Sequence, residues 1–228
     1  MQAQRLSNPY ILMWCQSLVA NLHVLRGAAA AAQQLAEASM VLATTLEVPF
    51  WGARSAFIRG IALTRQGCTA EGLEQMQEGW AAIQTTGVRL NRVYFLARLA
   101  EALLHAGQPD TGLTVLAEAL AFIHTSGERW WEAECHRLWG ECLLAQQEPK
   151  HEAGEVAVRF QHALDIARHQ HARSLELCVA MSLSRLWQQQ GKREEARQLL
   201  AEVYNWFTEG FDTTDLQEAK ALLEELGV

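Results

Sequence analysis

The sequence predicts an all-α fold, built as a solenoid of antiparallel helix pairs and closed by a C-terminal capping helix. One observation is composition: half of the 228 residues are hydrophobic, only four are prolines, and Ala, Leu, Gln, Glu and Arg predominate. These residues lose little conformational freedom in a helix. The second observation is a repeat in the positions of glycine and of small residues. Together they predict helical repeats and no β-sheet.

Glycines recur in two series with a period of 40 residues. The first series is interrupted at Gln147, and both consist of glycines that would follow a helix: Gly27, Gly67, Gly107 and Gly191, then Gly87 and Gly127. Glycine is favoured where a helix ends in a left-handed conformation. Two glycine series per period therefore predict two helices per repeat.

Small residues recur inside the predicted helices. The first helix of successive repeats carries Gly60, Ala100, Gly140 and Ser184, each followed three positions later by a large apolar side chain. A residue without bulk lets a neighbouring helix approach, and the large side chain fills the adjacent groove. Spacings of three and four keep such residues on one helix face.

We interpret residues 1–228 as one domain that consists of five repeats and a capping helix. The first helix opens at Tyr10 without a visible cap, and an insertion near Pro149 to Gly154 lengthens the fourth repeat. The predicted repeats span 8–46, 49–87, 90–127, 130–171 and 174–208, with the capping helix at 212–227.

Charge and cysteine content indicate which partners and which cellular location the protein can have. The formal net charge is −7 and the densest basic stretch is Lys192-Arg193, which argues against a nucleic-acid partner. No long apolar run predicts a membrane span, and Met1 to Leu6 do not resemble a signal peptide. Five cysteines without a Cys-x-x-Cys pair indicate buried free thiols and a cytoplasmic protein, namely Cys15, Cys68, Cys135, Cys142 and Cys178.

No catalytic, metal-binding or cofactor-binding residue is predicted. His162, His169 and His171 are close in sequence, but no further ligand stands at a metal-binding spacing, so a solvated cluster is the better interpretation. Serines such as Ser17 lie on predicted helices and lack the sharp strand-to-helix turn of a nucleophile elbow. The sequence therefore favours a protein that is not an enzyme.

The small-residue pattern resembles the tetratricopeptide repeat (TPR). The period of 40 exceeds the usual period of about 34 and is also compatible with HEAT or armadillo units. We favour the TPR interpretation because both halves of its signature recur in four repeats, with a short turn after Gly67, Gly107 and Gly191. The resemblance implies a right-handed superhelix whose first helices line a concave face.

Three segments resemble a more specific module. They are Gly127–Glu134, Phe160–Ala167 and Trp206–Thr213. These segments are similar to the C-terminal repeat region of bacterial proteins that join an adenylate/guanylate cyclase or regulator domain to an ATPase. The sensor-like repeats of MalT/LuxR-type regulators are similar more loosely. The resemblance implies a regulatory interaction module, and no Gly-x-x-x-x-Gly-Lys-Ser/Thr phosphate loop occurs in the chain.

Transferring the concave positions of the TPR family to this sequence gives a candidate site for a protein or peptide partner. Its mixed charges and two aromatics suit arginine–carboxylate pairs around an aromatic contact. Two alternatives stay open, a small-ligand sensor and a module that forms a homodimer through its N-terminal helix. The candidate residues are Trp14, Asn21, Arg54, Tyr94, Arg98, Glu101, Glu134, Arg137, Glu141, Arg185 and Gln188.

Overall fold

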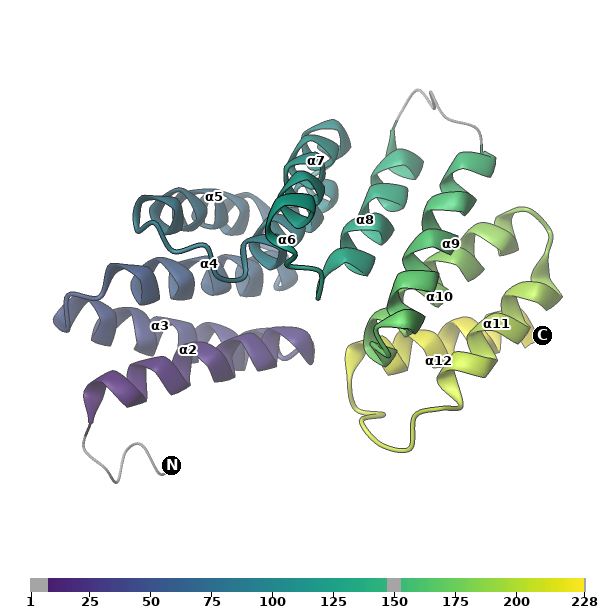
Figure 1. The fold of residues 1–228 in the computed structure, drawn as a ribbon. Coiled ribbons are helices and arrows are strands. Elements are labelled where there is room, and N and C mark those ends of the chain that lie inside the picture. The colour runs from purple at the N-terminus through teal and green to yellow at the C-terminus, as the bar shows by residue number, and fades with distance from the viewer. Residues whose placement is uncertain (1–7, 147–152, 228) are drawn as a thin grey trace. The chain divides into compact units, whose positions relative to one another are not determined.

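The computed structural model describes residues 8–146 and 153–227, and these residues form helices joined by turns and short loops (Figure 1). No strand occurs within these ranges. The predicted all-α class of paired helices is confirmed. The chain divides into two compact units, residues 1–106 and residues 107–228. Along the described chain, no helix is both long and apolar enough to cross a membrane.

Unit 1 contains two helix pairs and a fifth helix. Successive helices pack against each other, and α2 also contacts α4, so that helices of the same rank in neighbouring pairs touch. The core includes Met13, Phe57, Met76 and Phe95, all at most 1% exposed. The helices are α2 (Pro9–Leu25), α3 (Ala29–Thr45), α4 (Pro49–Arg65), α5 (Thr69–Thr85) and α6 (Arg92–His105).

Unit 2 has the same construction and ends in a cap. Its last helix packs on α10 and α11 through Leu216, Ala219, Leu222 and Leu226, while its other side carries charged and amide side chains. The predicted capping helix is therefore present. The helices are α7 (Pro109–Ser126), α8 (Glu132–Ala145), α9 (Ala153–His169), α10 (Arg173–Gln189), α11 (Arg193–Tyr204) and α12 (Thr214–Gly227).

The glycines of both series lie in the left-handed region, as predicted, with φ from 72° to 89°. Glycine adopts this conformation without the steric cost of a Cβ atom. Where neither series supplies a glycine, Glu47 (φ 55°) and His171 (φ 53°) take the same conformation. The left-handed turn therefore forms even where no glycine is present. For this reason the glycine series does not mark every helix end.

Three of the small residues, Gly60, Gly140 and Ser184, lie where the two helices of a pair pack closely. A Cβ atom on Gly60 would lie 2.7 Å from the carbonyl oxygen of Gly72, and one on Gly140 would lie 2.5 Å from the Phe160 ring. Ser184 is fully buried and donates a hydrogen bond to the carbonyl of Ala196 over 3.0 Å. These contacts explain why bulk is excluded at these positions.

Two local expectations were wrong. The first helix does have a cap, because the Asn8 side chain accepts hydrogen bonds from the backbone N–H groups of Tyr10 and Ile11 at 3.1 and 3.2 Å. Cys68 is exposed, since it stands in the turn before α5. Most of the insertion expected near Pro149 to Gly154, and the Met1 to Leu6 segment, lie outside the described residues.

Candidate functional site

In unit 1, an aromatic pair covers a buried arginine between α2 and α4. The rings of Trp14 and Trp51 lie edge to face with centroids 6.4 Å apart, and the Arg54 guanidinium carbon lies 5.6 Å from the Trp51 centroid. Arg54 Nη1 donates to the Ser17 carbonyl at 2.9 Å and to its hydroxyl at 2.6 Å. Burial lowers the pKa of Arg54 to about 10, because an uncharged form is favoured away from water.

Behind Arg54, three buried hydroxyls form a chain across three helices. Ser55 Oγ lies 3.0 Å from both Ser17 Oγ and Ser39 Oγ, and Ser39 donates to the Met13 carbonyl at 3.0 Å. Sequence reasoning missed this network. Its only signal was serine on helix faces that are otherwise apolar, where a hydroxyl needs a partner once buried. The network satisfies these hydroxyls and fixes the helix carbonyl that receives Arg54.

A second group links α6 to α2. The Tyr94 hydroxyl donates to Asn21 Oδ1 over 2.5 Å, and the Arg98 guanidinium carbon lies 5.5 Å from the Tyr94 ring centroid. Arg98 also forms an ion pair of 2.6 Å with Glu101, one turn further along α6. The structure therefore brings together four of the predicted site residues on the first helices of unit 1.

In unit 2, the predicted site residue Arg137 is neutralised by carboxylates of its own helix. Arg137 forms a two-pronged pair with Glu134, with Nε–Oε2 and Nη2–Oε1 distances of 2.8 and 2.7 Å, and lies 3.5 Å from Glu141. Ser182 of α10 donates to Glu141 over 2.6 Å. Although burial alone would lower the pKa of Arg137, the carboxylates of Glu134 and Glu141 raise it. This cluster is a closed arrangement of paired charges.

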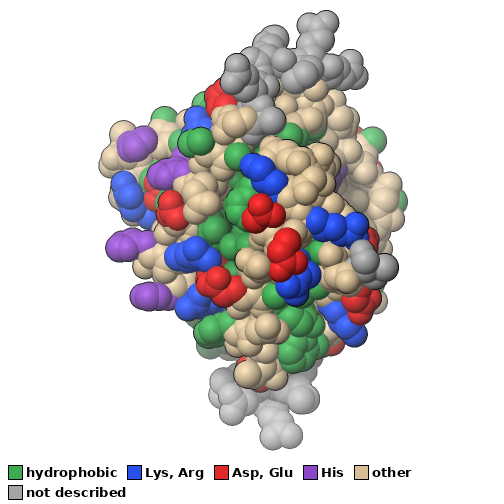
Figure 2. All heavy atoms as spheres, turned by 90° about the vertical axis from the view of Figure 1, so that its right-hand side faces the viewer, with side chains coloured by type: hydrophobic (Ala, Val, Ile, Leu, Met, Phe, Trp, Pro, Cys, Tyr) green, Lys and Arg blue, Asp and Glu red, His purple; other side chains and the backbone are tan. Residues whose placement is uncertain are grey.

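The last two predicted site residues lie on α10. Arg185 is exposed and lies 3.4 Å from Glu218 of α12, and Gln188 is half-buried one turn away. In the view of Figure 2, basic and acidic side chains are interspersed among hydrophobic ones. Pairs of this exposed kind contribute little to stability.

One histidine pair was not foreseen. The rings of His136 on α8 and His162 on α9 meet edge to face with centroids 4.6 Å apart, and Arg159 Nη1 lies 3.3 Å from His136 Nδ1. Burial, and then the neighbouring His162 and Arg159, lower the pKa of His136 to about 4. Within residues 8–146 and 153–227, no group of three or more His, Cys, Asp or Glu side chains is placed to hold a metal ion.

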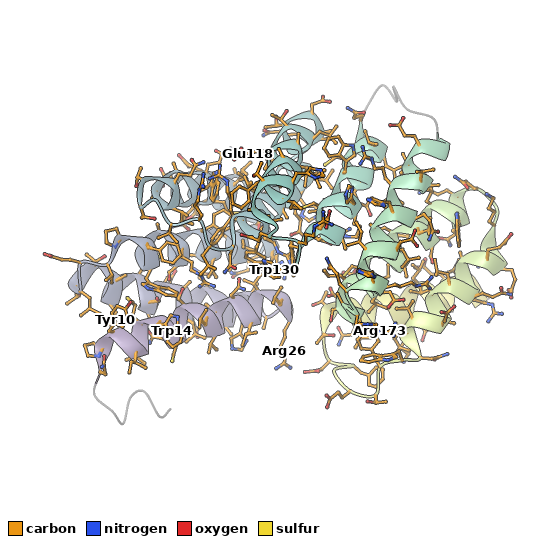
Figure 3. All side chains as sticks on the ribbon, in the orientation of Figure 1. Tyr10, Trp14, Arg26, Glu118, Trp130 and Arg173 are labelled. Carbon is orange, nitrogen blue, oxygen red and sulfur yellow. The ribbon has the colours of Figure 1, made fainter. Side chains whose placement is uncertain are left out.

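The exposure of the predicted residues differs from an open groove. Arg54, Tyr94, Arg98 and Glu134 are buried, whereas Trp14 is 43% exposed and projects from the N-terminal half of α2 near Tyr10 (Figure 3). The others are half-buried, apart from the exposed Arg185. The burial arises because first helices of neighbouring repeats contact each other directly, α2 with α4 and α4 with α6 in unit 1 and α8 with α10 in unit 2.

Comparison with known proteins yields likenesses in structure alone. No family model matches the sequence, and no curated protein matches it. Kinesin light chain TPR-like repeats from Podospora anserina align with a TM-score of 0.59 at 20% identity, over 86% of this chain and 93% of theirs.

Two Rap structures are also similar. A Rap protein in complex with competence and sporulation factor aligns with a TM-score of 0.66 at 12% identity, over 94% of this chain and 70% of that one. The apo form of RapI aligns with a TM-score of 0.61 at 12% identity, over 96% of this chain and 60% of that one. The chain therefore has a TPR-like helical repeat fold.

Proposed function

We propose that this chain is a non-catalytic interaction scaffold that binds a peptide or protein segment along its first helices, as a cytoplasmic regulatory module of a bacterial signal-transduction protein. The main support is the exposed Trp14 ring beside Trp51, with the half-buried Asn21 two turns further along α2, which together combine aromatic surface with a polar side chain in unit 1. The similar Rap protein was solved with competence and sporulation factor bound. The regulatory role rests on the resemblance of the three segments between Gly127 and Thr213.

A peptide array tests this proposal. The labelled full chain is applied to overlapping peptides, and binders are measured again in solution with a Trp14→Ala variant. The Trp14 side chain is 43% exposed, so truncation should leave the fold intact while weakening binding by about tenfold or more. Trp206→Ala is the matched control, because Trp206 is 56% exposed in unit 2. Binding that is equal in all three proteins contradicts the proposal.

Thermal unfolding with added small ligands distinguishes the alternative, a small-ligand sensor, from the scaffold. A ligand that binds only the native state raises the unfolding midpoint. Sugars and nucleotides that raise the midpoint, together with an array that yields no peptide, would favour the sensor over the scaffold.

A separate observation, an exposed apolar stripe on α2, supports the alternative of self-association through the N-terminal helix. Apolar side chains spaced by three and four form an exposed stripe on α2, made of Tyr10, Trp14, Leu18, Leu22 and Leu25. One period later, the equivalents of Leu18 and Leu22 are Ile58 and Ala62, which are fully buried by neighbouring helices. A helix that is apolar on all sides is typical of a covered one.

Sedimentation equilibrium tests the homodimer. We expect the wild type to dimerise and a Leu18→Lys/Leu22→Lys variant to be monomeric. Val41→Lys, at a 66% exposed position on α3, serves as the control and should dimerise like the wild type. A wild type that stays monomeric at high concentration removes this alternative.

A further inference from the structure

Charge is sorted between the two ranks of helices in unit 1. The second helices, α3 and α5, carry four glutamates and no Lys or Arg. The first helices, α2, α4 and α6, carry a single carboxylate, Glu101, against five arginines, namely Arg54, Arg59, Arg65, Arg92 and Arg98. The first helices of unit 1 thus carry an excess of positive charge in a chain whose net charge is −7.

Two of these arginines are neutralised within the unit. Arg59 reaches across to Glu37 of α3 at 2.8 Å, and Arg98 pairs with Glu101 at 2.6 Å. An arginine that is paired in this way has little electrostatic reason to attract a further anion. The excess positive charge must therefore be sought at the remaining positions.

Arg54 is a buried arginine with no carboxylate beside it. It is 4% exposed, and its hydrogen bonds go to the carbonyl and hydroxyl of Ser17. Among the residues that the structure describes, no carboxylate lies within ion-pair distance of Arg54, and burial lowers its pKa to about 10. Burying a guanidinium without a counter-ion is costly, and an incoming anion recovers part of that cost.

Unit 2 differs at the corresponding position. Two periods after Arg54, α8 carries Glu134, and this carboxylate pairs with Arg137 of the same helix at 2.7 Å. The first helices α8 and α10 carry three arginines and four glutamates in all. The first helices of unit 2 therefore have no positive excess, and an arginine at the position of Arg54 is specific to unit 1.

The surroundings of Arg54 define the rest of the ligand. Trp51 stacks on its guanidinium, and Trp14 meets Trp51 edge to face and is 43% exposed. These rings offer apolar contact beside the cation. A ligand that satisfies both features carries a carboxylate next to an apolar side chain, and Trp51 has to move aside for the carboxylate to reach Arg54.

We propose that the first-helix side of unit 1 binds an acidic peptide segment, in which one carboxylate pairs with Arg54 and an adjacent apolar side chain packs on Trp14 and Trp51. This inference rests on the proposed scaffold function and adds the chemical class of the partner. The axes of three neighbouring helices at a spacing of roughly 9 Å cover about 18 Å, which about six extended residues span, so a peptide of about ten residues is long enough.

The test uses two synthetic peptides of about ten residues, one of alternating glutamate and leucine and one with glutamine in place of each glutamate. Binding to the full chain is measured by fluorescence anisotropy. We expect the glutamate peptide to bind about tenfold or more tightly than the glutamine peptide, and its affinity to fall as salt is added.

Variants of Arg54 assign the effect. Arg54→Gln should abolish the preference for glutamate, whereas Arg54→Lys should retain part of it. Arg54→Gln keeps a donor for Ser17 and strands no carboxylate, so it should fold, and circular dichroism checks this. Arg197→Gln is the matched control, because Arg197 pairs with Glu194 on the exposed side of α11.

Two outcomes would overturn the inference. Equal binding of the two peptides, or an equal preference in Arg54→Gln and Arg197→Gln, shows that Arg54 does not recognise a carboxylate, while the scaffold function stands if the array still yields binders. A rise in the melting midpoint with inorganic phosphate that depends on Arg54, without binding of the glutamate peptide, would assign the site to a small anion instead.

Discussion

The hydroxyl of Tyr94 donates a hydrogen bond of 2.5 Å to the Asn21 side chain, although the two residues are 73 positions apart in the chain. Tyr94 is on α6 and Asn21 on α2, so the bond joins the first helices of the first and third repeats. A repeat protein is held mainly by contacts between neighbours. This bond is a contact beyond the nearest neighbour, and it ties the three first helices of unit 1 together.

Removal of the Tyr94 hydroxyl should weaken unit 1. We expect Tyr94→Phe to lower the free energy of unfolding by about 1 kcal/mol, since the hydrogen bond is lost while the ring stays packed. Urea denaturation followed by circular dichroism measures the change. Tyr204→Phe is the control, because no hydrogen bond of that hydroxyl is present in the described structure. Equal stability of the two variants would mean that the bond contributes nothing.

A methyl group at Gly60 should be costly. Its Cβ atom would lie 2.7 Å from the Gly72 carbonyl oxygen and 2.9 Å from the Met76 backbone nitrogen, and backbone atoms cannot rotate away. We expect Gly60→Ala to lower the free energy of unfolding by about 3 kcal/mol. Gly154→Ala, in a helix and with open space around it, should instead gain up to about 1 kcal/mol. Thermal melts of both variants decide the matter, and an unchanged Gly60→Ala protein would refute the close approach.

The closed charge cluster of unit 2 should depend on its arginine. Arg137→Met leaves Glu134, which is buried, without its partner, so we expect a loss of about 3–5 kcal/mol in the free energy of unfolding. Adding Glu134→Leu removes the stranded charge and should restore part of the loss. Chemical denaturation of the single and double variants measures this coupling. If the double variant is less stable than the single one, the loss has another cause.

Acid should destabilise unit 2 through His136. Its pKa in the fold is about 4, below the usual value of 6.5, so the unfolded chain binds the proton first as pH falls. The stability from neutral His136 is fully present above pH 6.5 and is lost between about 6.5 and 4, by about 3 kcal/mol. His136→Gln should flatten the pH dependence of the melting midpoint over that window. The control His169→Gln, at an exposed position on α9, should melt like the wild type at every pH.

The fold could be predicted from the sequence because its determinants are local. A glycine such as Gly67 marks a helix end through its own backbone, and Gly60 marks close packing through its lack of a side chain. Both effects repeat at a fixed period, so the helix pairs follow from one chain. The repeat ends at Glu47 and His171 were harder to predict from the sequence, because these residues adopt the left-handed conformation without being glycine.

Less of the candidate site could be predicted from the sequence. The positions of Arg54 and Tyr94 on the first helices followed from the repeat, but their burial depends on how closely α2, α4 and α6 approach. The serine network and the His136–His162 contact join residues 16 to 38 positions apart, and no local pattern signals them. Which arginine has a carboxylate nearby is likewise a property of the packed structure.

The outer side of α12 is polar, whereas α2 is apolar on the side away from its partner helices. Because of this difference, further repeats can be stacked on the protein at α2 but not at α12. Designed repeats fused ahead of α2 would find a matching surface to stack on, whereas units grafted after α12 would meet charged side chains and remain tethered without docking. A hybrid protein lengthened at its N-terminal end should therefore melt cooperatively with unit 1, and one lengthened at the other end should melt in separate steps.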